Sequence, residues 1–201
     1  IEYFMQEEAA LCDLPLEKPV DIEVAPEIPE LPPKPPNEKT LLNTIWWSIK
    51  LRYWAFKTDT FDGSKNVRIY VLYCDPSNYE IREVSVGIKK GKIGIVNAPA
   101  DKGLENHTNL VVTHEMLHTF GATDKYDYGS LMPIFPHGFA DPKRKPVYPQ
   151  KMAEIMAGRI PLSETEMKRP AGFHEVTIGI KTCVEINWLD ENELKQLESE
   201  L

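Results

Sequence analysis

Hydrophobic and polar positions recur in two different ways along this chain, and the difference separates predicted helices from predicted strands. In "NEKTLLNTIWWSIKLRYWAF", apolar residues stand at helical spacing, and Asn37 or Thr40 could cap the start of that helix. The helix carries a group of aromatic residues that we expect to pack in the core, with a binding stripe as the alternative: Trp46, Trp47, Tyr53 and Trp54. The short stretches "VRIYVLYC", "REVSVGI" and "KIGIVNAP" predict strands, and "KKGK" predicts a hairpin turn between the last two.

The second half of the chain predicts mainly helices. "NLVVTHEMLHTF" predicts a helix that begins near Thr108 and ends at Gly121, because glycine accepts the left-handed conformation at a helix end. "PQKMAEIMAGR" predicts a short helix, and another could begin at Ser163 in "SETE". "HEVTIGIKTCVEINW" predicts a late strand and "DENELKQLESEL" a polar terminal helix. Strands followed by helices indicate the α+β class.

Proline is concentrated near the start of the chain. Residues 19–36 contain seven of the 17 prolines, which predicts a stiff strap or linker rather than a core element. We therefore expect an N-terminal extension over residues 1–36 and a folded domain over residues 37–201. The first residues, "IEYFMQEEAA", are unlike a signal peptide, and a chain that opens on Ile1 is expected to be part of something longer.

Charge and cysteine content limit the classes of partner and of cysteine site that the chain could have. The formal net charge of -8 argues against nucleic acid or an anionic membrane surface, and no apolar run predicts a membrane span. Cys12, Cys74 and Cys183 are too few and too scattered for a disulfide framework or a cysteine zinc site. Three unreactive thiols are the simpler expectation, although one pair could bridge in an oxidising compartment.

The stretch "VVTHEMLHTFGATDKYDYGSLM", residues 111–132, carries the candidate chemistry. His114 and His118 are four residues apart, so on a helix both imidazoles project from one face toward one point. Imidazole nitrogen is a good zinc ligand, and Glu115 is placed to reach a zinc-bound water instead of the metal. This H-E-x-x-H pattern is typical of metallopeptidases, in which zinc lowers the pKa of its water toward about 7 and the glutamate acts as general base. The preceding strand, "KIGIVNAP", could present an edge to an extended peptide. A pair of surface histidines on a core helix is the alternative.

Two carboxylates are candidates for the third zinc ligand. Asp124 completes H-E-x-x-H-x-x-G-x-x-D, in which metzincins place a third histidine or aspartate. Glu154 lies in the mainly apolar run "MAEIMAGRI", where a buried carboxylate needs a partner such as a metal, and thermolysin-like enzymes complete their site with a downstream helical glutamate. A solvated helix position or an ion pair with Arg159 is the alternative for Glu154. The weaker candidates are Glu164, His137 and His174.

The string "THEMLHTFGATDKYD", followed by "FPHGFADPKRKPVYPQKMAEIMAGRIPLS", resembles the zinc metallopeptidase domain at the C-terminus of VgrG-type spike proteins of bacterial type VI secretion systems. The resemblance implies a zincin-like fold with a small, mostly antiparallel sheet and an H-E-x-x-H active-site helix. It implies a secreted toxin that acts in the periplasm of a target cell, with a spike-protein tether and an immunity protein as partners. It also implies a downstream glutamate as the third ligand, which favours Glu154 over Asp124.

Two functions remain open at this stage. The first is a zinc-dependent endopeptidase with Zn2+ as cofactor and a protein or peptide as substrate, in which Tyr126 could donate to the oxyanion of the tetrahedral intermediate or could be a structural tyrosine. The alternative is a non-catalytic, zinc-stabilised module that binds a target or spike-complex protein. Two histidines and one carboxylate leave an open metal position, which favours the enzyme.

Overall fold

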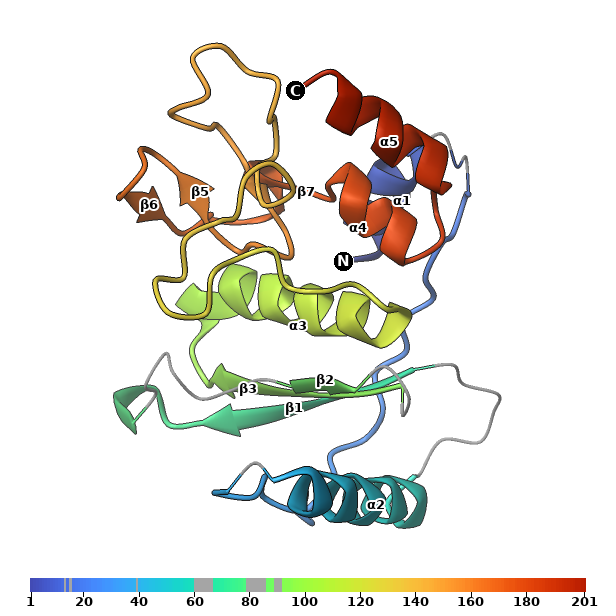
Figure 1. The fold of residues 1–201 in the computed structure, drawn as a ribbon. Helices are drawn as coiled ribbons and strands as arrows, with labels where there is room; N and C mark the ends of the chain where they lie inside the picture. The colour runs from blue at the N-terminus through green and yellow to red at the C-terminus, as the bar shows by residue number, and fades with distance from the viewer. Residues whose placement is uncertain (13, 15, 39, 60–66, 79–85, 89–91) are drawn as a thin grey trace. The chain divides into compact units, whose positions relative to one another are not determined.

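The computed structural model describes residues 1–12, 14, 16–38, 40–59, 67–78, 86–88 and 92–201 (Figure 1). They form two compact units, one of Ile1–Asp21 with Asn66–Leu201 and the other of Ile22–Lys65. The expected boundary at residue 36 therefore differs from the observed division, because residues 1–21 belong to the same unit as the C-terminal half. Helices and small sheets are mixed along the chain, in agreement with the α+β class.

A three-stranded sheet forms one layer of the larger unit. Its strands are β1 (Arg68–Cys74), β2 (Val86–Ile88) and β3 (Ile93–Pro99), in the order β1-β3-β2. β1 pairs parallel and β2 antiparallel with β3, which confirms the expected pairing of the last two strands. The turn residues 89–91 lie outside the described residues. β3 is the central strand, and β2 covers it over Ile93–Ile95, so this part of β3 does not offer the expected edge to a peptide.

Helix α3 (Glu105–Phe120) packs on this sheet (Figure 1). It begins three residues before the predicted Thr108, directly after a 3-10 turn over Lys102–Leu104. Its predicted end at Gly121 is confirmed: this glycine has a φ of 123°, and its N–H donates to the carbonyl oxygens of Leu117 and His118. The apolar side of α3 contributes Leu110 and Leu117 to the core.

The chain after α3 builds a second layer on the other side of this helix (Figure 1). Its elements are β4 (Ala153–Glu154), β5 (Ile160–Pro161), β6 (Met167–Lys168), β7 (Val176–Thr177), α4 (Ile180–Glu185) and α5 (Glu191–Ser199). β4 pairs parallel with β7, and β5 pairs antiparallel with β6. The predicted terminal helix is confirmed as α5, which is capped by the Asp190 side chain.

Three predictions for this region are wrong. Residues 149–159 form β4 and a turn instead of a helix, because pairing with β7 overrides the local helical spacing. The Ser163 side chain accepts hydrogen bonds from the backbone N–H groups of Thr165 and Glu166, but it closes a hairpin turn and no helix follows. Residues 174–188 form the end of a 3-10 turn over Phe173–Glu175, then β7 and α4, instead of one long strand.

The N-terminal helix α1 (Glu2–Leu11) was not predicted, yet it is part of the core of the larger unit. Its Phe4 ring stacks on Phe173, with centroids 4.5 Å apart, and Met5 is fully buried. Buried Glu8 accepts hydrogen bonds from the hydroxyl of Thr177 and the N–H of Ile178. Residues 1–12 therefore pack as a structural element and are not a linker.

A disulfide joins Cys12 to Cys183, so the expectation of three unpaired thiols is wrong. The bond connects the end of α1 to α4, across 171 positions of sequence. Cys74 is a free thiol on β1.

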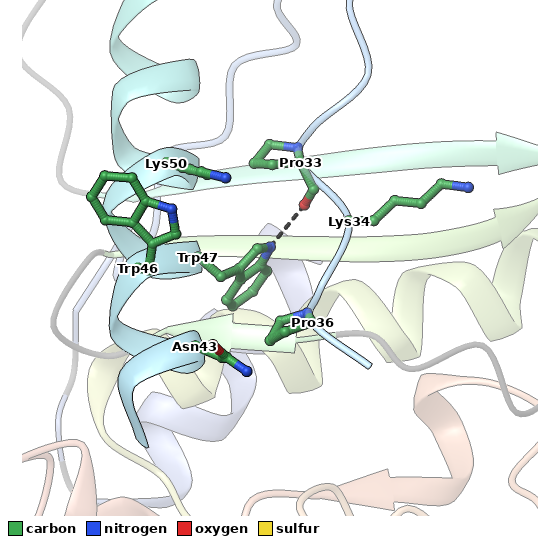
Figure 2. A pocket seen from close by; sticks show the side chains of 7 residues that line it. All are labelled: Pro33, Lys34, Pro36, Asn43, Trp46, Trp47 and Lys50. Carbon is green, nitrogen blue, oxygen red and sulfur yellow. Dashed lines mark hydrogen bonds between the residues drawn. The ribbon is translucent and has the colours of Figure 1, made fainter. Parts of the chain in front are cut away.

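The smaller unit contains α2 (Leu41–Lys57), which is capped by the Thr40 side chain as predicted. Its aromatic residues divide between two environments: Trp47 and Trp54 are buried, as core packing predicts, whereas Trp46 and Tyr53 are 59% and 68% exposed. Proline-rich chain lies against the helix, where the Trp47 indole N–H donates to the Pro33 carbonyl oxygen (2.8 Å; Figure 2). A pocket in this unit is lined by Pro33, Lys34, Pro36, Asn43, Trp46, Trp47 and Lys50. No helix among the described residues has the length and apolar character needed to cross a bilayer.

Replacing Cys12 and Cys183 together with alanine is expected to lower the free energy of unfolding by about 2–5 kcal/mol, because the crosslink restricts a very long loop of the unfolded chain. Urea denaturation of the variant and the wild type checks this. Cys74→Ala is the matched control and should cost less than about 1 kcal/mol. Equal stability of the double variant and the wild type would show that the bond contributes nothing.

Candidate metal centre

The centre is built on the last turns of α3. His114 and His118 lie one helical turn apart, and their Nε2 atoms are 3.1 Å from each other. The two side chains are only 17% and 18% exposed. The helical spacing read from the sequence therefore brings the two imidazoles to one point, as predicted.

Asp124 supplies a carboxylate to the same point. The chain turns at Gly121, where α3 ends, and comes back so that Asp124 Oδ1 lies 3.2 Å from His114 Nε2 and 3.1 Å from His118 Nε2. Among the described residues, this is the only group of three or more His, Cys, Asp or Glu side chains whose ligand atoms converge in this way. His114, His118 and Asp124 thus form a cluster able to hold a metal ion.

Both histidine rings are oriented through their other nitrogen. His114 Nδ1 lies 3.0 Å from the carbonyl oxygen of Ile155, and His118 Nδ1 lies 2.8 Å from that of Ala122. A carbonyl oxygen only accepts, so each Nδ1 carries the proton and donates it. In the neutral ring, the lone pair of Nε2 then points into the cluster, which is the tautomer that a metal ligand requires.

The spacing of the three atoms fits a tetrahedral metal ion. Neighbouring ligand atoms around zinc, with bonds of about 2.0–2.1 Å, are about 3.3 Å apart. The observed separations are 3.1, 3.1 and 3.2 Å. Two lone pairs and a carboxylate oxygen at such short range repel one another unless a proton or a cation lies between them. Three ligands also leave one tetrahedral position for a further group.

The same proximity shows in the acid–base properties of the cluster. Burial alone would raise the pKa of Asp124, but the hydrogen bonds and charges of His114 and His118 outweigh it and hold that pKa well below its usual range. Burial lowers the pKa of His114, while Asp124 and Glu115 raise it by more, so the net shift is upward. The cluster therefore favours an ionised carboxylate beside positive charge.

Glu115 follows His114 on the helix and is 6% exposed. Its side chain lies toward β3, because a Cβ placed on Gly94 would stand 3.7 Å from the Glu115 Cβ. Its negative charge acts on both His114 and Tyr126. Glu115 therefore stands beside the cluster without belonging to the group of converging ligand atoms.

Two tyrosines lie next to Asp124. Tyr128 was not predicted from the sequence, and its hydroxyl donates to Asp124 Oδ2 (2.8 Å). The predicted Tyr126 is half-buried and packs edge-on against Tyr128, with ring centroids 5.3 Å apart. Burial and the charge of Asp124 raise the pKa of Tyr126 to about 12, so this phenol stays protonated at neutral pH and is available as a donor.

The loop that carries Asp124 is fixed by a buried ion pair. The ammonium of Lys125 lies 2.6 Å from a Glu185 carboxylate oxygen on α4, and both side chains are largely buried. The same carboxylate accepts from the N–H and hydroxyl of Thr123. Backbone N–H of Lys125 donates to the carbonyl oxygen of Met156. Asp124 therefore sits between two residues that are anchored to other elements.

Glu154, the first choice for the third ligand, is corrected to Asp124. Glu154 is fully buried, as the apolar run suggested, but its carboxylate is satisfied by protein groups. One oxygen accepts from the N–H of Gly179 and the hydroxyl of Thr182, and the other from the N–H of Ala157. Burial raises the pKa of Glu154, and these hydrogen bonds and the charge of Lys125 only partly oppose that shift.

The weaker candidates also lie outside the cluster. His137 Nε2 is 3.3 Å from a Glu198 carboxylate oxygen on α5, Glu164 is exposed in the turn after β5, and His174 lies in the 3-10 turn before β7. Comparison with protein-family models, with curated proteins and with solved structures finds no match for this chain.

Asp124→Asn is expected to weaken zinc binding by more than about tenfold, because it removes the ionised oxygen that faces both histidines. Isothermal titration of the chelator-treated protein with zinc measures the change.

Glu154→Gln is the matched variant. It should bind zinc nearly as tightly as the wild type but unfold more easily, by about 1–3 kcal/mol, because its amide N–H2 cannot accept from Ala157. Strong loss of zinc binding in Glu154→Gln, with Asp124→Asn unaffected, would return the ligand assignment to Glu154.

Proposed function

We propose that the chain is a zinc-dependent endopeptidase with a zincin-like arrangement of its active-site helix. The observation that carries the proposal is the cluster of His114, His118 and Asp124, with the carboxylate of Glu115 beside it. A closed structural site usually has four protein ligands, whereas three leave a position for water or substrate. The arrangement therefore supports catalysis better than a purely structural metal site.

His114, His118 and Asp124 would hold the ion through Nε2, Nε2 and Oδ1. Zinc in such a site brings the pKa of water close to neutrality and polarises a carbonyl group. Glu115 would act as general base, taking a proton from the attacking water and passing it to the leaving amine. Its position supports this role, because it follows the ligand His114 on the helix and its charge acts on both His114 and Tyr126.

Tyr126 would stabilise the negative charge that develops on the carbonyl oxygen. Its phenol is protonated at neutral pH, because its pKa is about 12. It lies close enough to Asp124 and Glu115 for their charges to act on it, so its hydroxyl is at the margin of the cluster. Tyr128, held against Asp124 Oδ2, would instead orient the carboxylate ligand.

The biological role that we propose follows from the sequence resemblance. The strings "THEMLHTFGATDKYD" and "MAEIMAGRIPLS" resemble the peptidase domain of type VI secretion spikes. On that basis we propose an antibacterial effector that acts in the periplasm of a target cell, with a spike tether and an immunity protein as partners. The proline-rich chain of residues 22–36, which belongs to the smaller unit, would then be close to the tether.

Glu115→Gln is expected to keep zinc affinity within about twofold and to lower the rate of peptide cleavage by about 100- to 10,000-fold, because the ligands remain while the base is lost. Cleavage of an unfolded protein by the zinc-loaded variant, followed by mass spectrometry, provides the measurement.

Glu105→Gln is the control on the same helix, since Glu105 is exposed in the first turn, and it should cleave at the wild-type rate. A Glu115→Gln variant that cleaves as fast as this control would exclude Glu115 as the base.

A further inference from the structure

Two arginines and a histidine lie near the candidate metal cluster, and none of them pairs with a carboxylate within the described part of the chain. Arg159 directly precedes β5 and Arg169 directly follows β6, so they are the next residues outward from the Ile160–Lys168 pair of the ladder. Neighbouring strands are about 5 Å apart, so the two arginines start close together. His107, on the first turns of α3, is the third member of this basic group.

The interactions of these residues show that they share one environment. Burial, followed by the charges of Arg169 and Arg159, lowers the pKa of His107. Burial and the charge of Arg169 lower the pKa of Arg159. Within the described part of the chain, no ion pair joins any of the three to a carboxylate, and the Arg159 guanidinium donates one hydrogen bond, to the carbonyl oxygen of Gly158. The two arginine charges repel each other, in a chain whose net charge is -8, and a bound carboxylate would relieve that repulsion.

The basic group is also on the same side of α3 as the metal cluster. His107 precedes His114 by seven residues, or two helical turns, so both lie on one face about 10 Å apart along the axis. Arg159 acts electrostatically on Tyr126, which in turn lies beside Asp124. The path from the cluster to the basic group therefore follows α3 for about two turns. An extended peptide covers that distance with about three residues.

We propose that Arg159, Arg169 and His107 form a subsite that binds a carboxylate of the peptide substrate about three residues from the cleaved bond. Guanidinium groups suit this ligand, because their N–H groups pair with both oxygens of a carboxylate. Four of the five guanidinium N–H donors of Arg159 are uncommitted in the described structure, and Arg169 is exposed. The subsite rests on the proposed function, since it assigns a substrate class to the same centre.

Binding to the zinc-loaded Glu115→Gln protein tests the subsite apart from catalysis. Ten-residue peptides carrying a single glutamate at successive positions, each paired with its glutamine counterpart, are titrated by fluorescence anisotropy. We expect about tenfold tighter binding of the glutamate peptide at a favoured position, and loss of that preference when Arg159→Gln and Arg169→Gln are added. Equal binding of glutamate and glutamine peptides, with free and amidated ends alike, would overturn the proposal.

The free-acid and amidated forms of each peptide identify the source of the carboxylate. A preference that follows the glutamate assigns the subsite to an acidic side chain, and one that disappears on amidation assigns it to the peptide C-terminus. Lys168→Gln is the matched control: this lysine neighbours Arg169 on β6, points to the other side of the strand and pairs with Glu175. It should leave the preference unchanged, and an equal loss in Lys168→Gln would reduce the effect to overall charge and overturn the subsite.

The same peptides distinguish a failure of the peptidase function from a failure of the carboxylate subsite. If the wild-type protein cleaves none of the peptides but the preference is present and depends on the two arginines, carboxylate binding by the basic group stands and the peptidase function fails. If the wild type cleaves peptides without regard to their carboxylates, the peptidase function stands and the subsite fails.

Discussion

The buried carboxylate of Glu154 is the constraint on which the candidate metal centre depends. A carboxyl group removed from water must be hydrogen-bonded, and Glu154 meets this need by collecting donors from its own turn and from the start of α4. These bonds fix residues 154–158 in a tight turn. The turn then presents one carbonyl oxygen to the ring of His114 and the next to the N–H of Lys125, and it delivers Arg159 to the start of β5. The hydrogen-bonded carboxylate of Glu154 thus sets the orientation of the His114 ring, the path of the loop that carries Asp124 and the position of Arg159.

The sequence predicts the part of the centre that is local. His114, Glu115 and His118 are related by helical geometry alone, and Gly121 marks the end of that helix, so spacing is sufficient to place them. The choice between Asp124 and Glu154 depended on non-local packing. The physical argument that a carboxylate in an apolar run needs a partner is correct for Glu154, but the partners are backbone N–H groups and a hydroxyl, which no sequence pattern indicated. Asp124 closely follows the turn at Gly121 that ends α3. This nearness in sequence to the two histidines proved the better guide to the third group of the cluster.

The fold shows the same division between local and distant determinants. Helices α2 and α5, with capping residues at their starts, could be predicted, as could the pairing of β2 with β3. Residues 149–159 and 174–188 were assigned wrongly because β4 and β7 are two-residue strands, and each forms only by pairing with the other. Helix α1 gave little signal, since its buried face includes Glu8, which looks like a surface position until Thr177 and Ile178 are in place.

The link between Cys12 and Cys183 has a consequence for the order in which the molecule is made. A ribosome adds about 5–20 residues each second, so the first helix emerges many seconds before its covalent partner exists. The donors that satisfy Glu154 are made equally late, because Gly179 and Thr182 lie in the same stretch as Cys183. The nascent chain therefore contains both histidines of the cluster well before it contains the donors that fix the turn carrying the Ile155 carbonyl oxygen. The larger unit can therefore complete its core and its disulfide only after residue 183 has been synthesised.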